Sequence, residues 1–212
     1  GGGGGENVLF FLAFLNFFKK LLIFTFLIFK LTLIKKKKGK KDIDGKEKRQ
    51  NKEGKGGGSR EGKYLTFKLS DEEYGVSIFK IKEIIGMMAI TFIPRTPPFV
   101  KGVLNLRGKV IPVIDLRLKF GMESMDYNER TCIIVVEILG QGGSLLMGVV
   151  VDTVSEVLNI KVNEIEETPS FGTKLETNYI LGMAKMNGGV KILLDIDKVL
   201  SAEELEILDK AA

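Results

Sequence analysis

Residues 100–121, VKGVLNLRGKVIPVIDLRLKFG, form two apolar segments separated by a short stretch that contains Asn105, Arg107 and Gly108. Branched apolar residues on both sides of a glycine turn are typical of a β-hairpin, because Val and Ile favour extended backbone and glycine adopts a positive φ readily. Gly108 accounts for the turn by itself. Arg107 is therefore either a solvated surface residue, alone or paired with an acid, or a contact for a partner.

Apolar runs of the same kind occur along most of the chain. Leu65, Phe67 and Leu69 alternate with polar residues, which is typical of a half-buried strand. Further runs occupy 87–93, 103–106, 109–116, 131–139, 145–158, 180–186 and 190–196. Ser201 and Glu204 match a capping box and predict a C-terminal helix over about 201–211. The sequence therefore predicts an all-β domain with one helix at its end.

Two pairs of segments repeat within the chain. GVLNLRGKVIPVIDL (102–116) aligns without a gap with GMAKMNGGVKILLDI (182–196), and GVSIFKIKEII (75–85) aligns with GVVVDTVSEVL (148–158). Two matches in the same order indicate an internal duplication. We expect a first β subdomain near 63–120 and a second near 131–200, which pack on each other because units of this size bury little core alone.

Residues 1–62 differ from the rest in composition and charge. They contain 15 Lys and Arg against 6 Asp and Glu, a net charge of +9, whereas the other 150 residues contain 17 against 21, a net charge of −4. The apolar run 8–34 is long enough to cross a bilayer, but Lys19 and Lys20 lie near its centre. We expect 1–62 to be an artefact, a disordered extension or a membrane-contacting segment, and 63–212 to be the domain. The acidic domain argues against a nucleic-acid partner.

The inventory of reactive side chains excludes several classes of enzyme. The chain has no His and a single Cys, Cys132, inside an apolar run. Catalysis by His, Cys/His triads, the usual zinc sites and an intramolecular disulfide are therefore excluded, and we expect no cofactor. Cys132 is expected to be a small core residue in a reduced compartment. An enzyme that uses carboxylates alone would depend on Asp115 and Asp195, whose matched positions at the ends of equivalent strands favour a structural role.

Four segments resemble the CheW family of chemotaxis coupling proteins: YGVSIFKIKEII (74–85), IPRTPPFVKGVLNLRGKVIPVIDLRLKF (93–120), GVVVDTVSEVL (148–158) and SAEELEILDKAA (201–212). The resemblance covers 63–212. It implies two SH3-like five-stranded β-barrels around a hydrophobic centre, and a non-catalytic adaptor. The adaptor would link the regulatory domain of the histidine kinase CheA to the cytoplasmic tip of chemoreceptors, with a module of a CheV-like fused signalling protein as the alternative. It would lie in the cytoplasm at membrane chemoreceptor arrays and contact the membrane only indirectly or through 1–62.

The resemblance also implies which residues bind partners. They are Gly102, Asn105 and Arg107 of the hairpin, and Ile81, Glu83 and Ile84 of the segment KIKEI. The arginine would supply a planar set of donors for carboxylates or carbonyls on a partner helix, next to an apolar groove. For Ile81 and Ile84, a position in the core fits the apolar spacing at least as well.

Overall fold

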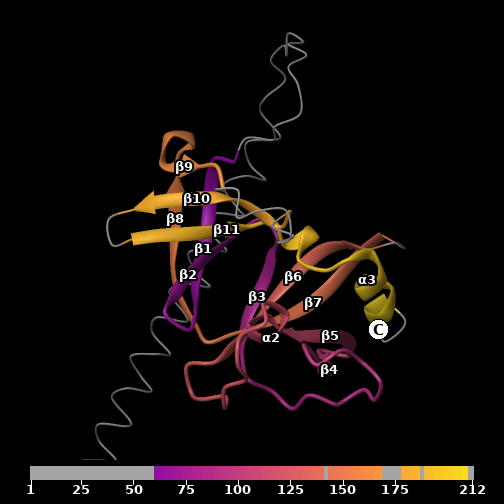
Figure 1. The fold of residues 1–212 in the computed structure, drawn as a ribbon. Coiled ribbons are helices and arrows are strands. Elements are labelled where there is room, and N and C mark those ends of the chain that lie inside the picture. The colour runs from indigo at the N-terminus through magenta and orange to yellow at the C-terminus, as the bar shows by residue number, and fades with distance from the viewer. Residues whose placement is uncertain (1–59, 141–142, 169–177, 187–188, 210–212) are drawn as a thin grey trace, which may run out of the picture. The chain divides into compact units, whose positions relative to one another are not determined.

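The computed structural model describes residues 60–140, 143–168, 178–186 and 189–209, within one compact unit that spans 56–212 (Figure 1). The elements are β1 (Gly62–Leu69), β2 (Glu72–Ser77), β3 (Ile81–Gly86), β4 (Val100–Leu106), β5 (Lys109–Asp115), α2 (Leu116–Lys119), β6 (Cys132–Gly140), β7 (Gly143–Val151), β8 (Thr153–Ile160), η1 (Val162–Glu164), β9 (Ile165–Glu166), β10 (Ile180–Met186), β11 (Gly189–Leu194), η2 (Ile196–Lys198) and α3 (Ala202–Asp209). The described residues are mostly strands, which confirms the predicted all-β class.

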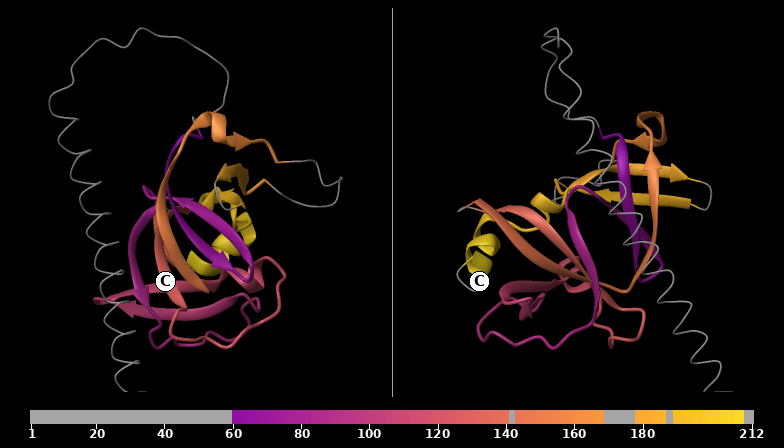
Figure 2. Two further views of the ribbon diagram at one scale, coloured as in Figure 1. Left: turned by 90° about the vertical axis from the view of Figure 1, so that its left-hand side faces the viewer. Right: turned by 180° about the vertical axis from the view of Figure 1, so that it is seen from behind.

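The strands form two sheets that curve into separate barrels (Figures 1 and 2). One sheet has the order β3-β6-β7-β5-β4 and is built from a continuous stretch of chain, 81–151, which we call the inserted barrel. The other has the order β8-β1-β2-β11-β10-β9 and takes strands from before and after that stretch. We call it the terminal barrel.

The predicted boundaries near 63–120 and 131–200 do not coincide with these barrels. The chain passes from the terminal to the inserted barrel at 78–80 and returns at Asp152, so residues 121–130 lie inside one barrel. The reason is that the third strand of each repeat pairs with the first strand of the other repeat: β3 pairs with β6, and β8 pairs with β1. Each barrel is therefore assembled from both repeats.

The internal duplication is confirmed by the register of the strands. In both barrels the second strand of the hairpin runs parallel to its neighbour, with Gly148 opposite Val113 in the inserted barrel and Gly75 opposite Leu193 in the terminal barrel. These pairs are related by the offsets of 73 and 80 residues that align the repeats. The hairpins β4–β5 and β10–β11 also shift register at the same place. The two barrels thus share one backbone plan.

Each barrel closes where the chain that follows the third strand of a repeat turns back onto the fourth strand of the same repeat. These strands are β3 and β4 in the inserted barrel, and β8 and β10 in the terminal barrel. In the inserted barrel this contact is a single bridge: the Thr91 N–H donates to the Val103 carbonyl at 2.8 Å, and the Val103 N–H donates to Thr91 at 2.9 Å. In the terminal barrel the corresponding contact is the two-residue strand β9 against β10. The extra strand makes the terminal sheet six-stranded instead of the five strands predicted.

Two strand predictions were wrong, and two strands were missed. The run 87–93 is not a strand apart from the bridge at Thr91; its apolar residues Met87 and Ile90 pack against the inserted core from irregular backbone. The run 145–158 is divided between β7 and β8 at Asp152. β2 and β3 were not predicted, because β2 begins with two glutamates and a register shift in β3 removes its period of two.

Strands β1 and β6 are buried on both faces. Ile133 and Val135 of β6 belong to the inserted core, and Ile134 on the opposite face is also buried. In β1 the prediction of a half-buried strand was wrong at Thr66, which is fully buried. Its hydroxyl donates to the Glu156 carbonyl at 3.0 Å and accepts the Glu156 N–H at 3.2 Å, so the polar group is satisfied inside the protein.

The C-terminal helix and its predicted cap are confirmed. The Ser201 N–H donates to the Glu204 carboxylate at 2.8 Å, and the Glu204 N–H donates to the Ser201 hydroxyl at 3.3 Å, which is the reciprocal capping box. Leu208 is buried and Leu205 is half-buried. Among the described residues, no helix has the length and apolar character needed to span a membrane. The run 8–34 lies outside these residues.

The two barrels differ at one pair of core positions. In the inserted barrel, Ile111 of β5 and Leu146 of β7 are part of an apolar cluster. The equivalent positions of the terminal barrel hold Lys191 of β11 and Glu73 of β2, which face each other in the parallel pair and form an ion pair. The Lys191 side chain is only 8% exposed and that of Glu73 is 24% exposed. The terminal barrel therefore contains a largely buried ion pair where its duplicate is apolar.

Candidate functional site

Arg107 and Glu83, two of the predicted site residues, form a two-pronged ion pair. The Arg107 guanidinium donates to the Glu83 carboxylate through Nη1 at 3.2 Å and through Nη2 at 2.6 Å. Glu83 lies on β3 and Arg107 on the β4–β5 turn, so the pair joins the two ends of the strand order of the inserted barrel. The Arg107 side chain remains 79% exposed, whereas that of Glu83 is 22% exposed. The pair holds a solvent-accessible guanidinium in a defined direction.

The turn that carries Arg107 has a backbone that disfavours an arginine. Both central residues have positive φ, 53° at Arg107 and 85° at Gly108, as the two-residue turns of β-hairpins require. Asn105 supports the turn by accepting the Gly108 N–H at 2.7 Å through its side-chain oxygen. Gly108 therefore does not satisfy the turn alone, because position 107 also needs a left-handed backbone, in which residues other than glycine and asparagine are strained.

Gly102 is a buried structural residue and does not itself present a contact surface. Its φ is +132°, and a Cβ at this position would lie 2.0 Å from the Thr91 carbonyl oxygen. This carbonyl accepts the Val103 N–H in the bridge that closes the inserted barrel. The equivalent Gly182 approaches the Glu166 carbonyl oxygen, at 2.7 Å from a built Cβ. A glycine is therefore needed at both closing contacts for a steric reason that involves no partner.

Ile81 and Ile84 are core residues in this structure. Ile81 is 0% exposed and Ile84 is 2% exposed, so neither side chain is available to a partner on the surface. Of the six predicted site residues, only Glu83, Asn105 and Arg107 reach the surface together. The apolar spacing of the segment KIKEI therefore reflects packing in the core, which was the alternative interpretation of Ile81 and Ile84.

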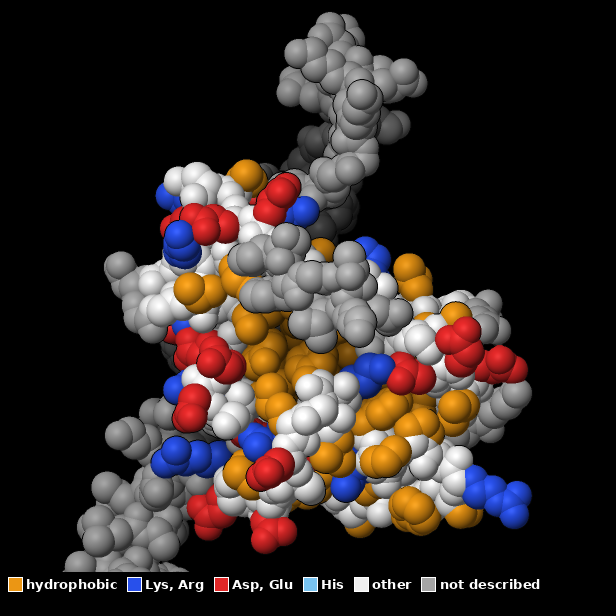
Figure 3. Space-filling model, in the orientation of Figure 1, with side chains coloured by type: hydrophobic (Ala, Val, Ile, Leu, Met, Phe, Trp, Pro, Cys, Tyr) orange, Lys and Arg blue, Asp and Glu red, His pale blue; other side chains and the backbone are white. Residues whose placement is uncertain are grey.

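Exposed apolar side chains on the hairpin and beside the closing bridge extend the candidate site beyond the predicted residues. Val110 lies opposite Asn105 in the hairpin and is 47% exposed, and Phe92, next to the closing bridge at Thr91, is 69% exposed. Figure 3 shows apolar side chains gathered near the middle of one face and over the side that carries β4 and β5. Phe92 was missed because it lies in the run 87–93, which was interpreted only as a strand. The surface combines a guanidinium with apolar contact area.

Asp115, a candidate for carboxylate catalysis, has a structural role. Its side chain caps α2 by accepting the N–H groups of Arg117 at 3.0 Å and Leu118 at 3.3 Å, and it accepts the Tyr127 hydroxyl at 3.0 Å. Burial, followed by the nearby Asp115 carboxylate, raises the pKa of Tyr127. The equivalent Asp195 forms an ion pair with Lys198 at 2.9 Å. The described contacts of both carboxylates are therefore with groups of the fold.

Cys132 is a buried core residue, as predicted, and its thiol is expected to be unreactive. Burial raises the pKa of Cys132 to about 12, so the reactive thiolate is scarce at neutral pH. We expect the native protein at pH 8 to resist Ellman's reagent, while the protein unfolded in urea releases one equivalent of thionitrobenzoate. Rapid reaction of the native protein would show that β6 opens readily at this end.

The chain is similar to a group of chemotaxis proteins over the part that the structure describes. Residues 63–204 match the family model of the CheW-like domain. Chemotaxis protein CheW of Klebsiella aerogenes is 42% identical over 149 residues, which cover 70% of this chain and 87% of that protein. Protein FrzA of Myxococcus xanthus is 32% identical over 142 residues, which cover 66% of this chain and 86% of that protein.

A solved structure agrees with these relatives. The crystal structure of the scaffolding protein TtCheW from Thermoanaerobacter tengcongensis matches with a TM-score of 0.60 and 38% identity, and the match covers 68% of this chain and 97% of that chain. The matched part has the two SH3-like barrels and the terminal helix described above. With the family model, the relatives and the fold in agreement, the chain belongs to the CheW family of chemotaxis scaffolding proteins.

Proposed function

We propose that this protein is a non-catalytic adaptor that couples the histidine kinase CheA to chemoreceptors, with a contact surface centred on Arg107. The observation that carries the proposal is the strained position of this residue. Arg107 has a φ of 53° and an exposed side chain, although glycine or asparagine would avoid a backbone cost of about 1–2 kcal/mol. Strain of this kind is retained most often where a side chain serves a function.

The chemistry of the surface suits a helical partner with exposed polar groups. A guanidinium has five N–H donors, and Glu83 engages two of its nitrogens, so the group also offers donors to a carboxylate or carbonyl of a partner. Phe92 and Val110 add exposed apolar area, which the hydrophobic face of a helix requires. The regulatory domain of CheA and the cytoplasmic tip of a receptor are the partners that we propose.

The location follows from the same proposal. An adaptor between a kinase and the cytoplasmic tips of receptors works in the cytoplasm, at membrane receptor arrays. The names of the relatives, chemotaxis and scaffolding proteins, support this assignment. Contact with the membrane would then be indirect or would involve residues 1–62.

The substitution Arg107→Asn separates binding from stability. It recreates the Asn-Gly pair that the second repeat carries at 187–188, and it relieves the strain at position 107. The lost ion pair is mostly exposed and contributes at most about 1 kcal/mol. We therefore expect a melting temperature equal to or above that of the parent, together with at least tenfold weaker binding to the CheA regulatory domain or to a receptor cytoplasmic fragment. Calorimetric titration and melting curves would measure both.

The matched control is Lys185→Ala. Lys185 occupies the position equivalent to Asn105 and forms an exposed ion pair with Glu166 in the terminal barrel, at 2.7 Å. Its loss should change neither binding nor melting temperature appreciably. Parent-like affinity of Arg107→Asn for both partners would remove Arg107 from the contact surface, and a fall in binding only in step with unfolding would make it a structural residue.

A further inference from the structure

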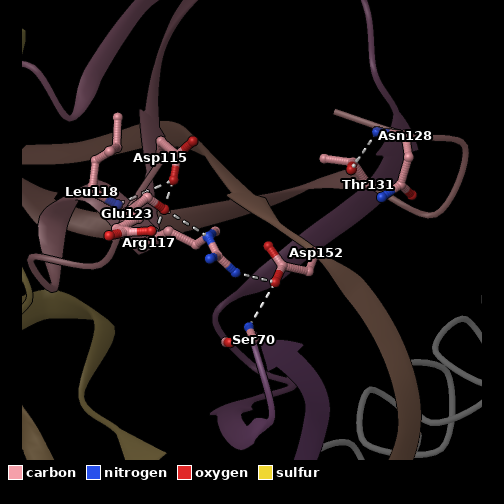
Figure 4. A network of polar contacts seen from close by, with 8 residues as sticks. All are labelled: Ser70, Asp115, Arg117, Leu118, Glu123, Asn128, Thr131 and Asp152. Carbon is pink, nitrogen blue, oxygen red and sulfur yellow. Dashed lines mark hydrogen bonds and ion pairs between the residues drawn. The ribbon is translucent and has the colours of Figure 1, made fainter. Parts of the chain in front are cut away.

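One carboxylate bridges the two barrels at the point where the chain returns to the terminal barrel. Asp152 is the single residue between β7 and β8. Its Oδ2 atom accepts the Arg117 guanidinium at 2.6 Å, and the same oxygen accepts the Ser70 N–H at 2.7 Å (Figure 4). Arg117 lies on α2, directly after β5 of the inserted barrel, whereas Ser70 lies in the β1–β2 turn of the terminal barrel. Asp152 therefore holds an element of each barrel.

A second carboxylate makes the same kind of connection near the other crossing. Asp197 lies in η2, directly after β11 of the terminal barrel. Its Oδ1 atom accepts the Leu139 N–H of β6, in the inserted barrel, at 3.0 Å. Its Oδ2 atom forms an ion pair with Lys80, at the crossing between β2 and β3. Asp197 thus joins the terminal barrel to both the crossing and the inserted barrel.

The two connections are related by the internal duplication, but their charges are reversed. Arg117 and Asp197 occupy equivalent positions, 80 residues apart, on the helical turn that follows the hairpin. In the Arg117–Asp152 pair, the basic residue lies on the helical turn and the acidic residue at the crossing. In the Lys80–Asp197 pair, the acidic residue lies on the helical turn and the basic residue at the crossing. Both crossings therefore have an ion pair between barrels even though the residues differ.

Both connections are partly shielded from water. The side chains of Arg117 and Asp152 are 13% and 15% exposed, and those of Lys80 and Asp197 are 33% and 20% exposed. Charged pairs at such sites interact more strongly than pairs on the open surface, because less water surrounds them. Each carboxylate also accepts a backbone N–H, which fixes its direction as well as its distance.

We propose that Asp152 and Asp197 are positioning residues that hold the two barrels in one fixed relative orientation. The crossings themselves are short, 78–80 and Asp152, and a bridge lies at each of them. The bridges act together with the contact of Phe120, in the inserted barrel, with Tyr74 and Tyr179 of the terminal barrel. Under the proposed function, on which this part of the inference rests, a partner bound at the Arg107 surface of the inserted barrel is then held at a defined angle to the terminal barrel and to any second partner bound there.

The orientation can be measured on the full chain without any partner. Residual dipolar couplings of backbone amides would be fitted separately for the inserted and terminal barrels. In the parent, both barrels should fit one common alignment tensor. In Asp152→Ala/Asp197→Ala we expect the tensors fitted to the two barrels to differ, while the couplings within each barrel still fit the structure of that barrel. A common, unchanged tensor in the double variant would overturn the proposal.

The controls separate orientation from folding. Glu166→Ala removes the acid of an exposed ion pair inside the terminal barrel and should leave the common tensor intact. If the double variant is unfolded, the single variants Asp152→Ala and Asp197→Ala decide the question: each should show a difference between the two tensors, and agreement in both would overturn the proposal. Asp152→Asn keeps an acceptor for Ser70 and should restore part of the common alignment.

A second measurement tests the consequence for coupling. In the Asp152→Ala/Asp197→Ala variant, the affinity for each partner alone should be unchanged, whereas assembly of the ternary complex should fall about fivefold or more, the lower range of typical couplings between sites. Unchanged ternary assembly with separate tensors would refute the role in coupling but leave the bridges themselves established. Failure of either partner to bind the parent would instead refute the proposed function, and the tensor measurement would still stand.

Discussion

Gly102→Ala is expected to unfold the inserted barrel or to open it along the contact between Thr91 and β4. The added Cβ would lie 2.0 Å from the Thr91 carbonyl oxygen and 2.8 Å from its carbonyl carbon, and both atoms belong to backbone that cannot rotate away. The φ of +132° adds strain for any residue with a side chain. We expect a loss of more than about 4 kcal/mol in the free energy of unfolding, which is exceptional for one methyl group. Urea unfolding would measure it.

Gly108→Ala is the matched control for this experiment. Gly108 also has a positive φ, 85°, but a Cβ there would meet nothing within 4 Å. The control therefore measures backbone strain without a clash, about 1–2 kcal/mol. Gly182→Ala, at the equivalent contact of the terminal barrel, should resemble Gly102→Ala more than Gly108→Ala. Equal midpoints for Gly102→Ala and Gly108→Ala would show that the closing bridge contributes little to stability.

Glu73→Leu is expected to destabilise the terminal barrel by about 3 kcal/mol, because it leaves the Lys191 ammonium buried without its partner. This value lies at the low end for broken buried ion pairs, since part of the Glu73 side chain is exposed to water. The loss should be visible in the urea midpoint. It should also appear as faster hydrogen exchange in β2 and β11 than in the strands of the inserted barrel.

The double substitution Glu73→Leu/Lys191→Ile tests the cause of that loss. It places in the terminal barrel the same residue types, leucine and isoleucine, that pack as Leu146 and Ile111 in the inserted barrel. Replacing a buried ion pair by apolar residues of similar size is often neutral or stabilising. We therefore expect the double variant to recover at least the stability of the parent. A double variant as unstable as Glu73→Leu would mean that the damage comes from packing and not from an unpaired charge.

The sequence predicted the elements of the fold better than their pairing. Local patterns specify most of the strands and the capping box at Ser201, because those signals depend on neighbouring residues. The pairing of β3 with β6 is different: the residues of β3 would look the same if they paired with β2 instead. Hydrogen bonding between backbones carries no side-chain code, so the exchange of third strands between the repeats cannot be inferred from the repeats alone.

For the candidate site too, the sequence predicted individual residues better than the contacts between them. The turn and its arginine were visible in the sequence, and the family motif singled out Arg107 and Glu83. Their ion pair was not predicted, because it joins residues 24 positions apart whose proximity depends on closure of the barrel. The role of Gly102 was also beyond the sequence, since the atom that excludes a side chain there is a backbone oxygen of Thr91, and every residue type has one.

The exchange of third strands has a consequence for synthesis on the ribosome. β1 and β2 emerge first, but their barrel also needs β8, β10 and β11, the last of which ends at Leu194. The inserted barrel is complete once β7 has ended at Val151, so it can fold while the first hairpin still exposes apolar residues such as Leu65 and Phe67. Strand pairing over such a distance is slow to form, because a long segment must be ordered before the contact is made. The nascent chain therefore passes through a stage in which the inserted barrel is folded while β1 and β2 of the terminal barrel are still unpaired with their later partners. At this stage they can aggregate or bind chaperones.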